Sequence, residues 1–137
     1  MDNRQTDTVT MNRRGLMRVL VIEDESIARE AVRHYLEFRG HDVTVAGSAI
    51  EAMDQALRHE PDVLLCDWKL NGSIDGVDVA RTLQGRHDVA VILITAHQLD
   101  DVKAKARRVG LNVNAYRRKP VSLASLAEII ESLEVRH

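Results

Sequence analysis

The chain has 137 residues, 45% of them hydrophobic and only 3% aromatic, and its formal net charge is −2. This length suits one domain with a sizeable aliphatic core, and the near-neutral charge excludes a global field that would attract nucleic acid or a membrane surface. A single cysteine, Cys66, excludes a disulfide framework and a zinc site of the usual kind. The apolar runs are too short to span a bilayer, and the chain starts without the apolar segment of a secretory signal. We therefore expect a cytoplasmic protein.

The first half of the chain begins with a polar stretch and then alternates strand and helix. Residues 1–16 are unpatterned, which predicts a disordered N-terminal arm ahead of a domain that we expect at 17–135. The continuous apolar run MRVLVI at 17–22 predicts a buried strand. Apolar residues at helical spacing predict a helix over 25–40, and alternation over 41–46 predicts a second strand.

The rest of the chain continues this alternation. A capping-box pattern opens the second helix, Gly110 closes the fourth, and Ser122 is placed to cap the fifth. The predicted helices of this part are 48–60, 76–85, 99–110 and 122–134, and the predicted strands are 62–66, 89–94 and 113–116.

Five strands that alternate with five helices predict a doubly wound α/β fold. Right-handed crossovers give a parallel sheet with helices on both faces, and we expect the strand order 2-1-3-4-5. In such sheets, sites form at the carboxyl ends of the strands, near the point where the strand order reverses.

Polar residues follow four of the five predicted strands. Glu23 and Asp24 follow the first strand, Asp67 the third, Thr95 the fourth, and Lys119 lies just beyond the fifth. Clustered carboxylates repel one another, and a bound hard cation stabilises their charged forms. Oxygen ligands suit Mg²⁺, with Mn²⁺ as an alternative. A metal-bound aspartate can attack phosphorus, while a lysine and a hydroxyl hold the phosphoryl oxygens.

With these residues in order, the sequence resembles the receiver domain of two-component response regulators, of which the chemotaxis regulator is the familiar single-domain member. The resemblance implies a flavodoxin-like receiver fold and extends from about Arg18 to Leu133. The motifs that carry it are VLVIEDE, SIAREAVRHYLEFRGHDV, DVLLCDWKL…DG, ILITA and AYRRKP.

The resemblance implies a phosphoacceptor and a metal site. Asp67 matches the phosphoacceptor aspartate. Glu23 and Asp24 match the acidic pair that holds Mg²⁺ together with Asp67 and the backbone carbonyl of Lys69. The phosphoryl group would come from a histidine kinase or a histidine phosphotransfer protein.

The resemblance also implies a switch. Thr95 matches the hydroxyl residue that moves on phosphorylation, and Tyr116 matches the aromatic residue that changes pose with it. Lys119 matches the lysine that contacts the acceptor, and its bond to Pro120 is typically cis in the family.

Two features depart from the family pattern. The first acid is Glu23 where aspartate is commoner, so its longer side chain should reach the metal through a water or a shifted rotamer. The loop after the acceptor is one residue longer than usual, and Asn71 stands where a proline is usual. Gly72 indicates a compensating turn, and the conformation of residues 70–75 is left open.

Each of these residues also has a plainer interpretation. Glu23 and Asp24 could form an acidic helix N-terminus, Asp67 could be a solvated acid at a strand end, Thr95 a helix cap, and Tyr116 ordinary packing. Cys66 is expected to be a buried, unreactive core thiol, and Trp68 to cover the loop. None of the histidines has a partner at ligand spacing, and those expected at the surface are His34, His41, His59, His87 and His137.

Basic residues gather on the fourth predicted helix and the fifth strand. They could form a solvated face or a partner surface, since the family commonly dimerises through its fourth helix, fifth strand and fifth helix. No nucleic-acid recognition motif accompanies them, so a nucleic-acid partner is not expected. They are Lys103, Lys105, Arg107, Arg108, Arg117 and Arg118.

The sequence predicts a stand-alone receiver domain that is not an enzyme and signals to a downstream protein by phosphorylation-dependent contact. Three alternatives stay open: a receiver segment of a hybrid kinase, a phosphatase of the haloacid dehalogenase type, and a binding module that is never phosphorylated. Phosphatases of the haloacid dehalogenase type carry a second aspartate two positions after the nucleophile. This chain has Lys69 at that position, which disfavours catalytic turnover of a phosphate ester.

The residues around the acceptor predict slow self-dephosphorylation. In the family, the side chains two positions after the acceptor and two after the switch threonine flank the path of the hydrolytic water. Here they are Lys69 and His97, and neither is a carboxamide or carboxylate that would orient a water. Ala96 is small and keeps the phosphoryl group accessible to a partner imidazole.

Overall fold

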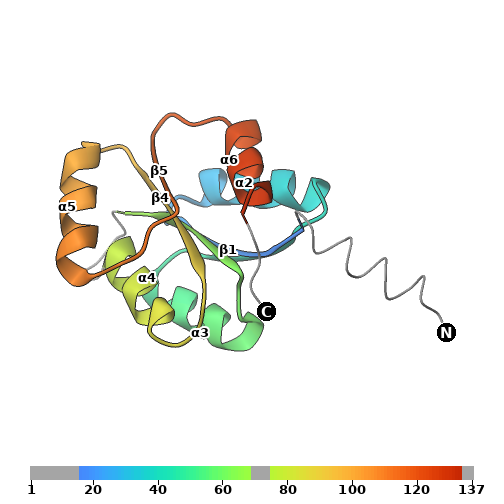
Figure 1. The fold of residues 1–137 in the computed structure, drawn as a ribbon. Helices are drawn as coiled ribbons and strands as arrows, with labels where there is room; N and C mark the ends of the chain where they lie inside the picture. The colour runs from blue at the N-terminus through green and yellow to red at the C-terminus, as the bar shows by residue number, and fades with distance from the viewer. Residues whose placement is uncertain (1–15, 69–74, 134–137) are drawn as a thin grey trace.

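Five parallel strands form one sheet in the order β2-β1-β3-β4-β5, as predicted (Figure 1). The computed structural model describes residues 16–68 and 75–133. A helix follows each strand, so every connection between strands is a helical crossover between parallel strands. The strands are β1 Arg18–Ile22, β2 Asp42–Ala46, β3 Val63–Asp67, β4 Ala90–Thr95 and β5 Ala115–Arg118. The helices are α2 Ser26–Phe38, α3 Ala49–His59, α4 Gly76–Gln84, α5 Leu99–Val109 and α6 Leu123–Glu131.

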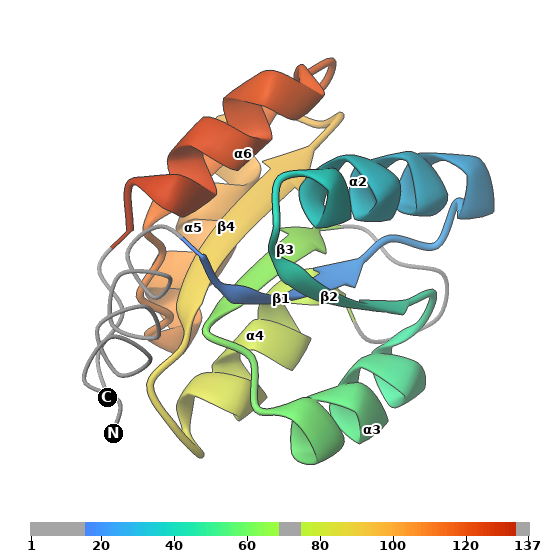
Figure 2. The ribbon, with the colours of Figure 1, turned by 90° about the vertical axis from the view of Figure 1, so that its right-hand side faces the viewer.

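The helices cover the two faces of the sheet in two groups. Because side chains alternate along a strand, Val19 and Val21 of β1 pack under α2 and α6, whereas Leu20 and Ile22 face α3, α4 and α5. Figure 2 shows α2 and α6 together on one side of the sheet and α3 and α4 on the other. The predicted doubly wound α/β fold is therefore confirmed. None of the helices in the described part of the chain is long and apolar enough to cross a membrane.

The edge strand β5 begins two residues later than the sequence predicted. It pairs with β4 from Ala115 to Arg118, with Ala115 opposite Ile92. Asn114 explains the shift, because its side-chain oxygen accepts a hydrogen bond from the N–H of Val91 at 2.9 Å. A side-chain hydrogen bond thus replaces one backbone hydrogen bond between the two strands. The predicted strand over 113–116 was therefore wrong by two residues.

His41 is buried, so its predicted surface position was wrong. Only 4% of the residue is exposed. Its Nδ1 accepts a hydrogen bond from the N–H of Met17 at 3.0 Å, and its Nε2 lies 2.9 Å from Oε2 of Glu131 in α6. The imidazole therefore joins the start of the sheet to the last helix.

The other histidines follow the prediction in part. His34 and His59 are exposed, as expected, whereas His87 is half-buried. The Nε2 atom of His87 is buried and has no hydrogen-bond partner within the described residues. His137 lies outside those residues.

Candidate functional site

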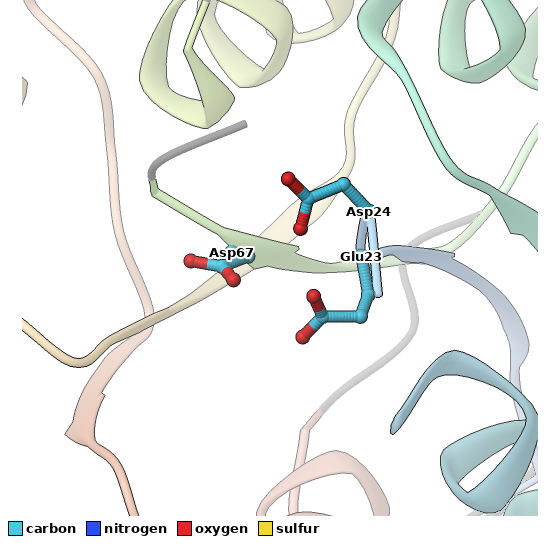
Figure 3. Close-up of side chains that lie close together, drawn as sticks. All are labelled: Glu23, Asp24 and Asp67. Atoms are coloured by element: carbon cyan, nitrogen blue, oxygen red, sulfur yellow. The ribbon is translucent and has the colours of Figure 1, made fainter. Parts of the chain in front are cut away.

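Three carboxylates meet at the carboxyl edge of the sheet. Glu23 and Asp24 directly follow β1, and Asp67 is the last residue of the neighbouring strand β3. Each offers one oxygen that lies within 4.8 Å of the others, and Figure 3 shows the three side chains turned toward a common space. Three carboxylates without nitrogen or sulfur ligands suit a hard divalent cation that keeps part of its water shell. The residues present therefore fit Mg²⁺.

Lys119, which directly follows the edge strand β5, reaches the cluster with its side chain. Its Nζ donates hydrogen bonds to Oδ2 of Asp67 at 2.9 Å and to Oε1 of Glu23 at 3.1 Å. Its backbone N–H donates to the carbonyl of Thr95 at 2.7 Å, and its bond to Pro120 is cis, as the resemblance implied. Burial lowers the pKa of Lys119, but the hydrogen bonds to the two carboxylates outweigh burial and leave that pKa above its usual value. The ammonium group therefore stays charged beside Asp67.

Glu23 is the most constrained member of the cluster. Only 8% of the residue is exposed, and its Oε2 accepts the N–H of Glu25 at 3.1 Å while its Oε1 receives Lys119. Burial raises the pKa of Glu23, and the charge of Asp67 adds to this rise. The hydrogen bonds from Glu25 and Lys119 lower the pKa, but they do not cancel the rise. The charged form of the cluster is thus costly without further positive charge.

Thr95 and Tyr116 lie one and two strands away from the acceptor. Thr95 ends β4 and is fully buried, and its Oγ1 accepts a hydrogen bond from the backbone N–H of His97 at 2.8 Å. Because a hydroxyl also carries a hydrogen, Oγ1 keeps a donor for another acceptor. Tyr116 is half-buried in β5, and Nζ of Lys103 in α5 lies 5.4 Å from the centre of its ring. Burial raises the pKa of the Tyr116 phenol.

Trp68 and His97 pack against each other beside the acceptor. Their rings meet edge to face with 5.7 Å between the ring centres and 85° between the planes. Trp68 is buried, and its backbone N–H donates to the carbonyl of Ile94 at 3.0 Å. Ala96 and His97 are exposed in the loop between β4 and α5. Lys69, Asn71 and Gly72 lie outside the described residues.

Gly76 brings the start of α4 against the acceptor strand. A Cβ at this position would stand 2.2 Å from the carbonyl oxygen of Asp67 and 2.5 Å from Sγ of Cys66, so no other residue fits without movement. The N–H of Gly76 donates to the carbonyl of Trp68 at 2.7 Å. Cys66 is fully buried, and burial raises the pKa of its thiol, which agrees with the expected unreactive core residue.

Two cations near the site make contacts that the sequence pattern did not indicate. Lys105 of α5 donates to Oδ2 of Asp75 at 3.2 Å, and it lies 3.4 Å from Oδ1 of Asp78. Lys105 is thus engaged within the chain, whereas the sequence placed it on a solvated or partner-binding face. Arg29 of α2 donates to the backbone carbonyl of Glu23 at 2.9 Å. Only the tertiary fold brings these pairs together.

Comparison with known proteins gives consistent matches over nearly all of this chain. The sequence model of the response regulator receiver domain matches residues 19–131. The response regulator MprA of Mycobacterium leprae (strain TN) is 30% identical over 118 residues, which are 85% of this chain and 50% of MprA. The chain spans about half the length of the curated relatives it matches.

Solved structures of receiver domains show the same fold. A CheY-like receiver domain protein from Methanospirillum hungatei JF-1 is 25% identical, with a TM-score of 0.75 over 85% of this chain and 91% of that one. The signal receiver domain of a modulated diguanylate cyclase from Desulfovibrio desulfuricans G20 is 35% identical, with a TM-score of 0.74 over 85% and 91%. The fold, the carboxylate cluster and these matches together show that the chain belongs to the response regulator receiver domain family.

Proposed function

We propose that Asp67 is the phosphoacceptor of this receiver domain and takes its phosphoryl group from a histidine kinase or a histidine phosphotransfer protein. Receiver domains act in two-component signalling and are generally signalling modules, not enzymes. The observation that carries the proposal is the contact of Asp67 with Lys119 at 2.9 Å, within reach of Glu23 and Asp24.

The chemical step is an in-line displacement at phosphorus. A carboxylate oxygen of Asp67 attacks, the O–P bond forms as the P–N bond of the donor phosphohistidine breaks, and the imidazole leaves with its electron pair and gains a proton. Mg²⁺, held by Glu23, Asp24 and Asp67, would supply positive charge to the phosphoryl oxygens during transfer. The ammonium of Lys119 is placed to bind one of these oxygens once Asp67 is esterified.

The output is a shift between two conformations. We propose that the hydroxyl of Thr95 turns toward a phosphoryl oxygen and that Tyr116 changes pose with it. The contact of Lys103 with the ring of Tyr116 supports this, because it links α5 to the switch residue. The surface of α5, β5 and α6 would then contact a downstream protein or a second copy of this chain.

The lifetime of the phosphoryl group is proposed to be long. The exposed imidazole of His97 packs on Trp68, the residue after the acceptor, which supports a position beside the approach of a hydrolytic water. The proposed shielding by Lys69, and the proposed role of its carbonyl as a metal ligand, concern a residue outside the described part. Ala96 is exposed and small, which supports an open path for the partner imidazole.

The proposal concerns the receiver unit and applies equally to a separate regulator and to a receiver joined to further domains. The receiver domain of the Desulfovibrio protein, for example, belongs to a diguanylate cyclase. The boundaries 17–135 and a cytoplasmic location stay predictions from the sequence.

The test is phosphorylation by a small donor. Acetyl phosphate with Mg²⁺ is expected to add one phosphoryl group to the wild-type protein, as measured by intact mass, and Asp67→Asn is expected to add none. Asp75→Asn is the matched control, because Asp75 is a nearby aspartate at the same edge of the sheet, and asparagine is also a good N-cap. An undiminished adduct on the Asp67→Asn variant would overturn the proposal.

A further inference from the structure

The guanidinium of Arg29 fixes the peptide group that joins two of the metal-site residues. Its Nη1 donates to the carbonyl oxygen of Glu23 at 2.9 Å. That oxygen belongs to the peptide between Glu23 and Asp24, and this peptide is planar. Holding the oxygen therefore sets the plane of the peptide and, with it, the direction in which Asp24 leaves the backbone.

Asp24 depends on this backbone contact more than the other two carboxylates do. Glu23 is held by Lys119 and by the N–H of Glu25, and Asp67 is held by Lys119. Across residues 16–68 and 75–133, the carboxylate of Asp24 makes no hydrogen bond or ion pair of its own. Its position thus follows from the backbone at residues 23 and 24.

Gly47, at the end of β2, leaves the space that the Arg29 side chain uses. A Cβ at residue 47 would lie 2.6 Å from Nη1 of Arg29, closer than carbon and nitrogen approach without bonding. The backbone of Gly47 is not in the left-handed region, so the conformation itself does not demand glycine. The absence of a side chain at Gly47 instead leaves space for the guanidinium of Arg29.

We propose that Arg29 is a positioning residue of the cation site, seated by the missing side chain at Gly47, and that it preorganises Asp24 for Mg²⁺. The inference rests on the proposed function, because it assumes that the carboxylate cluster binds a divalent cation. It runs against the simple electrostatic expectation, in which a nearby positive charge weakens cation binding. The two effects have opposite signs, so they can be separated.

The experiment measures Mn²⁺ binding by the loss of the free-ion EPR signal, in wild type and in variants. Arg29→Ala is expected to weaken binding about tenfold, as the loss of an outer-shell contact commonly does. Gly47→Ala is also expected to weaken Mn²⁺ binding, because the new methyl group displaces the guanidinium of Arg29 while the charge of Arg29 remains. Gly85→Ala is the matched control, since its Cβ would meet only ordinary contacts at 3.4 Å and beyond, and binding should be unchanged.

The double variant Arg29→Ala/Gly47→Ala tests whether the two changes break one contact. It is expected to bind as weakly as Arg29→Ala alone, because coupled changes are not additive. Tighter binding by Arg29→Ala, with Gly47→Ala unchanged, would show a charge effect alone and overturn the inference. If wild type itself binds no Mn²⁺, the proposed function fails instead.

Unfolding temperatures in the presence of a chelator separate this role from general stability. A Cβ at residue 47 would meet Oε1 of Glu51 at an ordinary 3.4 Å and would come too close only to the flexible tip of Arg29. Gly47→Ala is therefore expected to unfold at nearly the wild-type temperature while binding Mn²⁺ more weakly. Should Arg29→Ala fail to fold, Gly47→Ala alone decides, and wild-type affinity in that variant would overturn the inference.

Discussion

Lys105 of α5 donates a hydrogen bond to Asp75, the N-cap residue of α4, and so ties the helix next to the switch strand to the segment that follows the acceptor. Burial raises the pKa of Asp75, but the N–H of Asp78 and the ammonium of Lys105 outweigh burial and leave that pKa below its usual value. The ion pair is only partly exposed, with 24% of the Lys105 side chain and 18% of the Asp75 side chain accessible. We therefore expect it to contribute to stability.

Lys105→Gln is expected to lower the free energy of unfolding by about 1 kcal/mol, the upper end for partly exposed ion pairs. Urea unfolding near neutral pH measures it. Arg58→Gln is the matched control, because Arg58 pairs with Asp54 on the open surface of α3, with 69% and 59% of the side chains exposed. A loss as large in Arg58→Gln as in Lys105→Gln would contradict a specific role for the α4–α5 contact.

Mg²⁺ is expected to raise the unfolding temperature, because it binds the folded cluster and relieves the repulsion between Glu23 and Asp67. At a hundredfold excess over its dissociation constant, a ligand of the folded state stabilises by about 2.7 kcal/mol. Asp24→Asn should lose most of this gain. Asp100→Asn, an exposed aspartate at the start of α5, is the control and should keep it. Equal responses of both variants would place the cation elsewhere.

The contacts of Glu131 predict a loss of stability in acid. Burial raises the pKa of Glu131, but hydrogen bonds from Arg39 and His41 outweigh burial and leave that pKa below its usual 4.5. A carboxylate with a lowered folded-state pKa contributes stability above its unfolded-state pKa, and this contribution is lost as the pH falls through the folded-state pKa.

Glu131→Gln should therefore be less stable than wild type at pH 6, and the difference should shrink as the pH falls below about 4.5. Urea unfolding at a series of pH values measures the difference. Glu128→Gln serves as the control, because Glu128 is an exposed residue of the same helix. A difference between wild type and Glu131→Gln that does not change with pH would contradict the prediction.

His97→Ala is expected to shorten the lifetime of phospho-Asp67 about fivefold, which corresponds to roughly 1 kcal/mol in the barrier. Removing the imidazole from the edge of Trp68 opens the approach to the acceptor. The decay of the phosphorylated protein, followed by intact mass after the donor is removed, provides the measurement. Lys69→Asn should act in the same direction, and His34→Ala, an exposed histidine on α2, should have no effect. An unchanged decay in the His97/Lys69 double variant would leave no shielding role for either residue.

The fold and the carboxylate cluster could be predicted because both follow from local patterns. Asp67 ends a buried apolar run, and the carboxyl ends of parallel strands share one edge, so its approach to Asp24 follows from strand order alone.

Two features that the sequence did not predict depend on contacts between distant parts of the chain. The burial of His41 depends on Glu131, 90 positions later, and the start of β5 depends on a side-chain hydrogen bond of Asn114 to β4. Arg29 finds its acceptor only six positions away, but it does so through a backbone carbonyl, which no side-chain motif records.

The hydrogen bond from Gly76 to the carbonyl of Trp68 closes the chain on itself across residues 69–75. Both anchors of that segment are fixed to the sheet, Trp68 through Ile94 and Gly76 through its close approach to Asp67. The two ends of the segment are therefore set by contacts with the sheet, and position 76 tolerates no side chain without movement of its neighbours. A segment that is one residue longer than usual is thus compatible with an acceptor that the sheet holds in an unchanged place.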